Sequence, residues 1–203
     1  MSVRLDGASP NANLLMPKLQ YRFRVNLQNF GDDTTVERIL TTQVIDVTRP
    51  TVSFEPITMD VYNSKVNIAG KHTWEPITLT LRDDASRNVQ NGVGQQLMKQ
   101  FDFWEQASAA AANTYKFETN IEILDGGNGN LQPTVIESYR LVGCFVENAN
   151  YNQLSYATND AVTVTLSIRY DNAIQYANDG PGSERPLDTT VGREPFTPDG
   201  TTN

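Results

Sequence analysis

The sequence predicts a mainly β protein, an antiparallel β-sandwich or barrel flanked by one α-helix. Two patterns predict this fold: several segments alternate apolar and polar side chains with period two, whereas one segment, about 87–112, repeats apolar side chains with a helical period. The length of 203 residues predicts one domain with extensions. A chain of this size buries enough apolar surface to hold a core without a disulfide or a metal.

The period-two pattern is strongest in three segments, 19–28, 115–124 and 162–170. Because successive side chains of a strand point to opposite faces, each segment predicts a strand with one buried and one wet face. A glycine-rich turn, LDGGNGN, follows the second segment and predicts a hairpin with the next strand. Further strands are expected over about 36–47, 51–61, 73–82 and 134–146.

The helical pattern places apolar side chains on one stripe of the segment 87–112, and the alanines near its end favour a helix. We expect Leu97, Phe101 and Trp104 to pack this helix against the sheet. The pair Asp83–Asp84 precedes the segment, where a carboxylate can cap the first helical turn.

The composition excludes several classes of protein. The chain carries 24 Asp and Glu against 16 Lys and Arg, which gives a net charge of −8. This charge argues against a protein that binds the phosphates of a nucleic acid. One cysteine and one histidine exclude an internal disulfide, a cysteine-cluster zinc site and a two-histidine metal site. No apolar run approaches the roughly 20 residues of a membrane span, and the first residues do not resemble a signal peptide, so we expect a cytoplasm-made protein without membrane contact.

The sequence offers no convincing catalytic residue. His72 lies in a turn-like context typical of surface histidines, and the Asp83–Asp84 pair is better explained by capping than by acid–base chemistry. Cys144 lies in the apolar run LVGCFV, which predicts a buried thiol. The glycine-rich loop after Asp125 lacks the spacing of a calcium site. We therefore expect no enzyme, with no catalytic residue, cofactor or metal; Trp74 is left open between core and interface.

The chain divides into three parts: an N-terminal arm over 1–17, a β domain over 18–172 and a Pro/Gly-rich acidic extension over 173–203. Segment 46–70 stands out within the domain, because it combines many apolar side chains with two prolines that exclude a central strand. We interpret it as an excursion that offers its apolar side chains to a partner, with burial in the chain's own core as an equally weighted alternative. The candidate contacts are Val52, Phe54, Ile57, Met59 and Tyr62.

Three stretches resemble, in order and spacing, the tail tube proteins of contractile-tail, T-even-like bacteriophages. They are VNIAGKHTWEPITLTLRDD (66–84), LMKQFDFWEQASAA (97–110) and the stretch 136–172, and the resemblance covers roughly 19–172. The helix approach SRNVQNGVG and the long C-terminal extension depart from the family pattern. The motif positions are Asn67, Ala69, Gly70, Trp74 and Gly143.

The resemblance implies a fold and a structural role. Tail tube proteins close into hexameric rings with a continuous inner β-barrel, and the rings stack into a tube; type VI secretion and pyocin tubes share the fold. The implied partners are further copies of the chain, a sheath outside, the tape measure protein and DNA in the lumen without sequence-specific binding, and a baseplate and terminator at the ends. The implied location is the virion tail, and the excursion 46–70 would reach the neighbouring ring.

Alternatives stay open at this point. A type VI secretion-like tube protein would share the fold but not the virion. A non-catalytic carbohydrate-binding β-sandwich would use Trp74 and neighbouring aromatic side chains to stack on sugars. The sequence also leaves open whether the chain forms the main tube or a homologous initiator or terminator ring.

Overall fold

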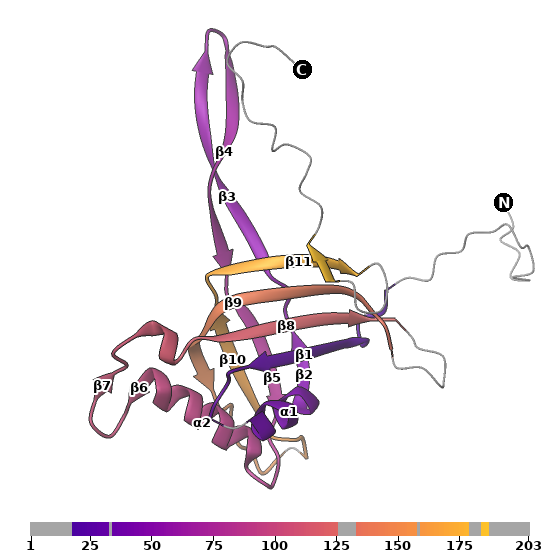
Figure 1. The fold of residues 1–203 in the computed structure, drawn as a ribbon, viewed down its shortest axis with the longest axis vertical. Coiled ribbons are helices and arrows are strands. Elements are labelled where there is room, and N and C mark those ends of the chain that lie inside the picture. The colour runs from indigo at the N-terminus through magenta and orange to yellow at the C-terminus, as the bar shows by residue number, and fades with distance from the viewer. Residues whose placement is uncertain (1–17, 33, 126–132, 158, 179–183, 187–203) are drawn as a thin grey trace, which may run out of the picture.

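The computed structural model describes residues 18–32, 34–125, 133–157, 159–178 and 184–186. Two antiparallel sheets form the body, two helices cover one end of it, and a long hairpin projects from the opposite end (Figure 1). The expectation of a mainly β, antiparallel fold is therefore confirmed. The predictions for the arm 1–17 and for the turn within 126–132 concern residues outside the described part of the chain.

The first sheet runs in the order β1, β8, β9, β11, β12 and is antiparallel throughout. Its alternation of buried and wet positions follows the sequence pattern: Val25, Leu27 and Ile121 are buried while their neighbours in the strands are not. The hairpin expected between the second and third of these strands is confirmed. The strands are β1 (Phe23–Gln28), β8 (Phe117–Leu124), β9 (Val135–Asn150), β11 (Asn172–Asn178) and β12 (Glu184–Pro186).

The second sheet continues from the far half of β9 through β10 (Thr163–Arg169) and β5 (Ile77–Arg82) to β2 (Val44–Val47). Its buried face meets that of the first sheet in one hydrophobic core. Burial of these side chains is the main force that holds the two sheets together. The fully buried core side chains include Val25, Phe30, Leu40, Ile77, Leu79, Leu81, Phe117, Ile121, Leu141, Leu166 and Ile168.

Strand β9 passes from one sheet to the other at Gly143. Residues up to Val142 pair with β11, whereas Phe145 and the residues after it pair with β10. Gly143 has φ +72°, and a Cβ atom there would collide with the carboxylate of Asp171. Because other residues are strained at this φ and a side chain has no room, the corner requires glycine.

The helical content differs from the prediction of a single helix. Helix α1 (Thr34–Gln43) occupies most of the segment 36–47 that was predicted as a strand, and only Val44–Val47 is β. The prediction failed because the β-branched residues of TTVERILTTQ mimic a strand, whereas its apolar side chains recur at helical spacing. Leu40 from this helix is fully buried in the core.

Helix α2 (Asn88–Gln100) is also shorter than predicted. Phe101 is already extended, and the short strands β6 (Phe101–Asp102) and β7 (Ala107–Ser108) replace the predicted helix end. The carboxylate of Asp102 accepts the backbone N–H groups of Trp104 (2.8 Å) and Glu105, which folds a turn in place of a helical turn. A 3-10 helix, η1 (Ala112–Thr114), follows.

The helix-packing prediction holds only in part. Leu97 packs against the core, whereas Phe101 and Trp104 lie beyond the helix and Trp104 is 92% exposed. The capping prediction is confirmed for Asp84, whose carboxylate accepts the backbone N–H of Asn88 at 2.9 Å. The expected domain limit at residue 172 falls at the start of β11, which adds a further strand beside β9.

Candidate assembly surfaces

Segment 46–70 forms most of a hairpin that projects from the body (Figure 1). In the part of the chain that the structure describes, its strands β3 (Thr51–Val61) and β4 (Ser64–Glu75) pair only with each other. An isolated two-stranded ribbon is marginally stable in water. A ribbon of this length with apolar side chains therefore points to a surface that is covered in an assembly.

A β-bulge divides the hairpin. Phe54 pairs with His72 and Pro56 pairs with Ala69, so that Gly70 and Lys71 together face a single residue of β3. The bulge lets β3 carry a proline inside a strand. The motif position Gly70 lies at this bulge, and three other motif positions, Asn67, Ala69 and Trp74, lie on the same strand.

Beyond the bulge, the apolar side chains of the hairpin share one face. Register places Ile57, Met59 and Val61 of β3 beside Ile68 and Val66 of β4, and all five are between 45% and 54% exposed. We call these five residues the tip face.

The opposite side of the hairpin tip is polar. Thr58 donates a hydrogen bond to Asn67 (2.9 Å), and Lys65 pairs with Asp60 at 3.6 Å. Tyr62, at the turn, is 99% exposed. A ribbon that is apolar on one side and polar on the other favours docking through the apolar side.

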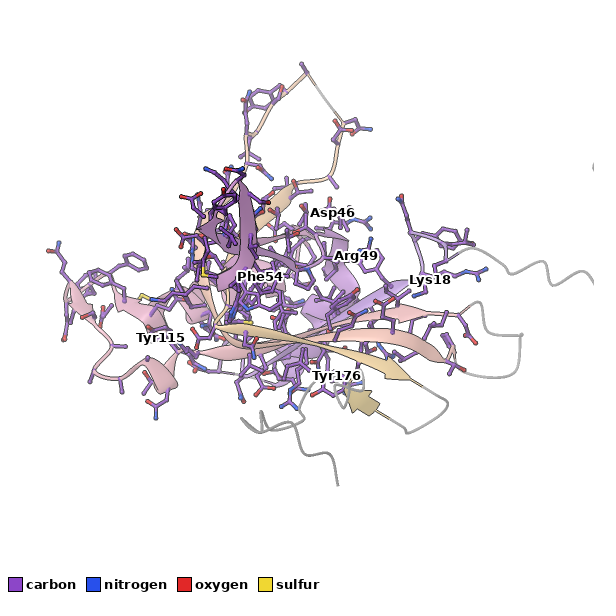
Figure 2. The ribbon with its side chains drawn as sticks, turned by 90° about the horizontal axis from the view of Figure 1, so that it is seen from above. Lys18, Asp46, Arg49, Phe54, Tyr115 and Tyr176 are labelled. Atoms are coloured by element: carbon purple, nitrogen blue, oxygen red, sulfur yellow. The ribbon has the colours of Figure 1, made fainter. Side chains whose placement is uncertain are left out.

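Before the bulge, the apolar side chains lie on the other face. Val52 faces Trp74 across the strands and Phe54 faces His72. Phe54, labelled in Figure 2, is 57% exposed. We call Val52 and Phe54 the base face. Because β3 alternates regularly, Phe54 and Ile57 point to opposite sides of the ribbon. All five predicted contact residues are thus on the surface, which contradicts the alternative that they fill the chain's own core.

Trp74 belongs to the core edge. Its ring packs against Tyr170, with 5.7 Å between the ring centroids, and its indole N–H is buried without a partner in the described residues. An aromatic platform for a sugar must be open to solvent, so this placement removes the residue on which the carbohydrate-binding alternative rested.

The wet face of the first sheet carries paired charges. Arg24 donates from Nε to Glu122 at 2.7 Å, and Asn26 donates to the same carboxylate at 3.1 Å. Arg140 donates from Nε and Nη2 to one oxygen of Glu118, at 2.9 and 2.7 Å. We call Arg24, Glu118, Glu122 and Arg140, together with the amides between them, the polar face; its four charges sum to zero. The sequence showed the wet alternation but not these pairs.

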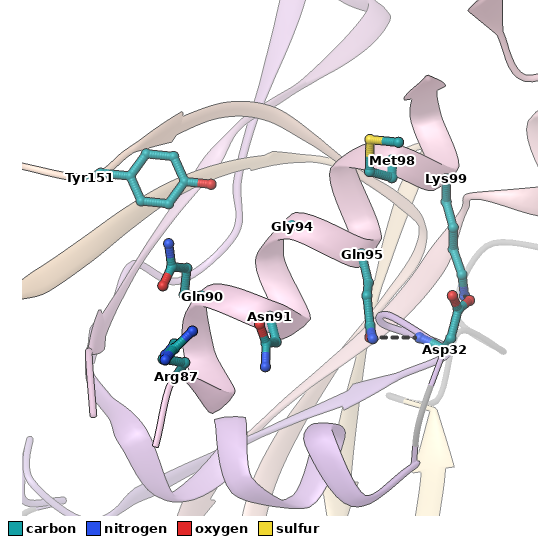
Figure 3. Close-up of a pocket in the computed structure, with 9 residues that line it drawn as sticks. All are labelled: Asp32, Arg87, Gln90, Asn91, Gly94, Gln95, Met98, Lys99 and Tyr151. Atoms are coloured by element: carbon teal, nitrogen blue, oxygen red, sulfur yellow. Dashed lines mark hydrogen bonds and ion pairs between the residues drawn. The ribbon is translucent and has the colours of Figure 1, made fainter. Parts of the chain in front are cut away.

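A shallow polar pocket lies along α2 (Figure 3). Asp32 forms an ion pair with Lys99 at 3.0 Å, and Gln95 accepts the backbone N–H of Asp32. Gly94 leaves the helix surface open, because none of the described residues places an atom within 4 Å of where its Cβ would be. In the described part of the chain, no group of three or more His, Cys, Asp or Glu side chains could hold a metal ion.

Further exposed apolar side chains lie on two loops that were not predicted as surfaces. Phe103 and Trp104 project from the turn between β6 and β7, and the loop after β9 exposes Leu154 and Tyr156. Single apolar residues among polar ones, as in NQLSYATND, are a sequence pattern from which these exposed side chains could have been predicted. None of the helices in the described residues is long and apolar enough to cross a membrane.

The chain was compared with known proteins. No protein-family model and no curated protein matches it. A chain of the sheath-tube complex of the extracellular contractile injection system PVC is similar at 16% identity and a TM-score of 0.58, over 81% of this chain and 95% of that one. A chain of the tube-terminating cap of the anti-feeding prophage is similar at 14% identity and a TM-score of 0.60, over 86% and 100%.

A chain of the anti-feeding prophage baseplate, solved with six-fold symmetry, is similar at 14% identity and a TM-score of 0.52, over 80% of this chain and 97% of that one. These likenesses show the fold. This chain has the tail tube fold found in contractile injection systems, as the sequence resemblance predicted.

Proposed function

We propose that this protein is the tail tube subunit of a contractile injection system and acts without catalysis. The observation that carries the proposal is the shared fold, which spans nearly the full length of chains from a sheath-tube complex and a tube cap. The proposed assembly is a hexameric ring, in line with the six-fold symmetry of the similar baseplate. The rings stack into a tube in the tail of a phage-like particle.

The free edges of the first sheet support ring closure. Among the described residues, β1 is the last strand on one side, and on the other side β12 pairs with Tyr176, Ala177 and Asn178 of β11 and leaves the rest of that strand without a neighbour on that side. Exposed edges pair readily with other strands, and closure of a ring removes them. In the proposed ring, β1 of one copy lies beside β11 of the next, and the polar face lines the lumen.

The hairpin supports stacking. It carries the base face and the tip face on opposite sides of one ribbon, and both are exposed in the single chain. A projecting ribbon that covers two apolar areas at once fits between two neighbouring copies. We place this contact between successive rings, through Val52, Phe54, Ile57, Met59 and Tyr62.

The remaining partners follow from this placement. Helix α2 lies at the end of the body opposite the projecting hairpin (Figure 1), and in the proposal it faces the sheath together with the loops that expose Trp104 and Tyr156. Baseplate and terminator proteins would contact the two ends of the stack. The tape measure protein and DNA would occupy the lumen without sequence-specific contacts.

Negative-stain electron microscopy of the purified protein tests the proposal. We expect hollow rings that stack at high concentration. Phe54→Asp and Met59→Asp should leave a folded subunit, seen by circular dichroism, but prevent stacking, because each buries a charge in an apolar contact. The matched control is Asp60→Asn on the polar side of the same ribbon, which should still stack. Long tubes formed by Phe54→Asp and Met59→Asp would remove the hairpin from the interface, and a wild-type protein that forms neither rings nor tubes, even on baseplate nuclei, would contradict the proposal.

A further inference from the structure

The polar face presents its arginines outward and its carboxylates inward. The side chains of Arg24 and Arg140 are 48% and 46% exposed, whereas those of Glu122 and Glu118 are 13% and 27% exposed. Arg140 donates two N–H groups to one oxygen of Glu118, and Arg24 donates from Nε to the Glu122 oxygen that also lies 2.6 Å from its Nη2. The hydrogen bond to Glu118 raises the pKa of Arg140 further above its usual value.

Register aligns these pairs across three strands that are distant in sequence. Arg24 lies directly opposite Glu122 on β8, and Arg140 of β9 lies opposite Asn120, between the two glutamates. An exposed ion pair of this kind contributes only about 0–1 kcal/mol to folding. Stability of the subunit is therefore a weak reason for these ion pairs. Their main consequence is that they neutralise the charges on this surface.

A free arginine on this face would bind phosphate. The guanidinium group matches a phosphate with two parallel hydrogen bonds, and each phosphate contact adds salt-dependent affinity. An arginine whose N–H groups already bond a carboxylate has to break those bonds before it can bind a phosphate. The Arg24–Glu122 and Arg140–Glu118 pairs therefore offer a passing polyanion neither a free cation nor a net charge.

We infer that Glu118 and Glu122 are masking residues, which hold Arg24 and Arg140 so that the polar face does not bind the phosphates of a nucleic acid passing along the tube. The inference rests on the proposed function, because it places the polar face in the lumen. It favours nucleic acid as the cargo, since masking of cations changes the passage of an anion and not that of a neutral chain.

The protein contains a matched control. Arg169 donates from Nε and Nη2 to one oxygen of Glu147, at 3.1 and 2.8 Å, with side chains 44% and 37% exposed. This pair has the same chemistry but joins β10 to the far half of β9, in the second sheet. Glu147→Gln thus changes the net charge by the same amount as Glu118→Gln, on a different surface.

The test uses the full chain and a short fluorescent duplex DNA as the probe. Tubes of five proteins are assembled with the probe, pelleted and treated with nuclease. The five are the wild type, Glu118→Gln, Glu122→Gln, the double variant and Glu147→Gln. We expect wild-type tubes to retain little DNA. The double variant should bind at least about tenfold more tightly at low salt, with a steeper salt dependence, and should protect the DNA from nuclease. When Arg140→Gln is added to the Glu118→Gln variant, the extra DNA binding caused by Glu118→Gln should disappear.

The inference is overturned if the double variant binds no more DNA than wild type, if Arg140→Gln does not reverse the gain, or if the bound DNA is as sensitive to nuclease as that on Glu147→Gln tubes. Failure of the proposed function shows separately, as the absence of tubes in micrographs of the wild type. In that case fluorescence anisotropy with the unassembled variants still decides whether the glutamates mask the arginines.

Discussion

Gly70 lies so close to Glu55 that a Cβ atom on Gly70 would be 2.5 Å from the carbonyl oxygen of Glu55. The contact lies at the bulge where the apolar side of the projecting hairpin changes from the base face to the tip face. The two apolar areas are presented by one ribbon, so the geometry at this glycine sets how they are oriented relative to each other. This gives a physical reason for glycine at a motif position of the tail tube resemblance.

We predict that Gly70→Ala weakens the hairpin and not the body. The added methyl group forces apart two backbones, a local cost of about 1–3 kcal/mol. Hydrogen exchange should show faster exchange in β3 and β4, ring stacking should decrease, and the thermal midpoint of the body should stay within error. A variant that stacks as well as wild type, with unchanged exchange in the hairpin, would contradict the steric argument.

Gly94→Ala is the matched glycine control. Gly94 lies inside α2, and no atom of the residues that the structure describes lies within 4 Å of the position of its Cβ. Alanine in an open helix interior is expected to stabilise the protein by about 0.5–1 kcal/mol, because it restricts the unfolded chain and favours the helix. Chemical denaturation measures the gain. A loss of stability would contradict the argument that the surface of α2 at Gly94 has room for a methyl group.

Gly143→Ala is predicted to destabilise the whole domain. The residue has φ +72° at the corner where β9 changes sheets, and its Cβ would meet the carboxylate of Asp171. Strain at this φ and the collision together should lower the free energy of unfolding by about 2–4 kcal/mol. Asp171→Ala in the same chain should recover part of the loss, although it also removes the ion pair with Lys116. If the two substitutions lowered the free energy of unfolding additively, the strain in Gly143→Ala would not come from the collision with Asp171.

The sequence predicted β1, β8 and β10 because each of these strands has one buried and one wet face. The alternation around Val25, Ile121 and Leu166 survives folding, since their strands lie at the core with solvent on the other side. The prediction failed at α1 because the β-branched residues there are compatible with a strand. The helix forms because it buries Leu40 in the core. The prediction failed at the end of α2 because one side chain, Asp102, captures the next N–H groups.

The candidate surfaces were predictable to different degrees. Apolar residues beside prolines identified the hairpin segment, so Phe54 and Ile57 could be chosen from sequence alone. Their placement on opposite sides of the ribbon depends on pairing along β3 and β4. The masking pairs could not be predicted, because Arg24 and Glu122 are 98 residues apart and meet only through the register of β1 and β8.

Cys144 is predicted to be unreactive in the folded protein. Burial raises the pKa of its thiol from 9.0 to about 11. Since the folded pKa is raised, the neutral thiol stabilises the fold fully below about pH 9, and this contribution is lost as the pH rises toward 11. A thiol-reactive disulfide reagent near about pH 8 should label the native protein only at the rate of unfolding. An exposed cysteine at Gln90→Cys serves as the control, and equal labelling rates at both sites would show that the Cys144 thiol is accessible.

Gln96 is predicted to be the most sensitive polar residue of α2. It is fully buried, its side-chain oxygen accepts the backbone N–H of Gly31 at 3.1 Å, and its amide donates to the carbonyl oxygen of Tyr115 at 2.6 Å. Gln96→Leu keeps the volume but leaves both backbone groups buried without a bond, at a cost of about 1–3 kcal/mol each. We expect a clear fall in the midpoint of denaturant unfolding.

Gln95→Leu is the control on the adjacent residue. Among the described residues Gln95 accepts one long hydrogen bond, at 3.3 Å from the exposed Asp32 backbone N–H, so water can replace it and the change should stay within about 0.5 kcal/mol. The difference between the two variants isolates the effect of burial, because both remove the same amide from the same helix. If Gln96→Leu were as mild as Gln95→Leu, the groups of Gly31 and Tyr115 would have to find other partners. The link from α2 to the ends of β1 and β8 would then not depend on this side chain.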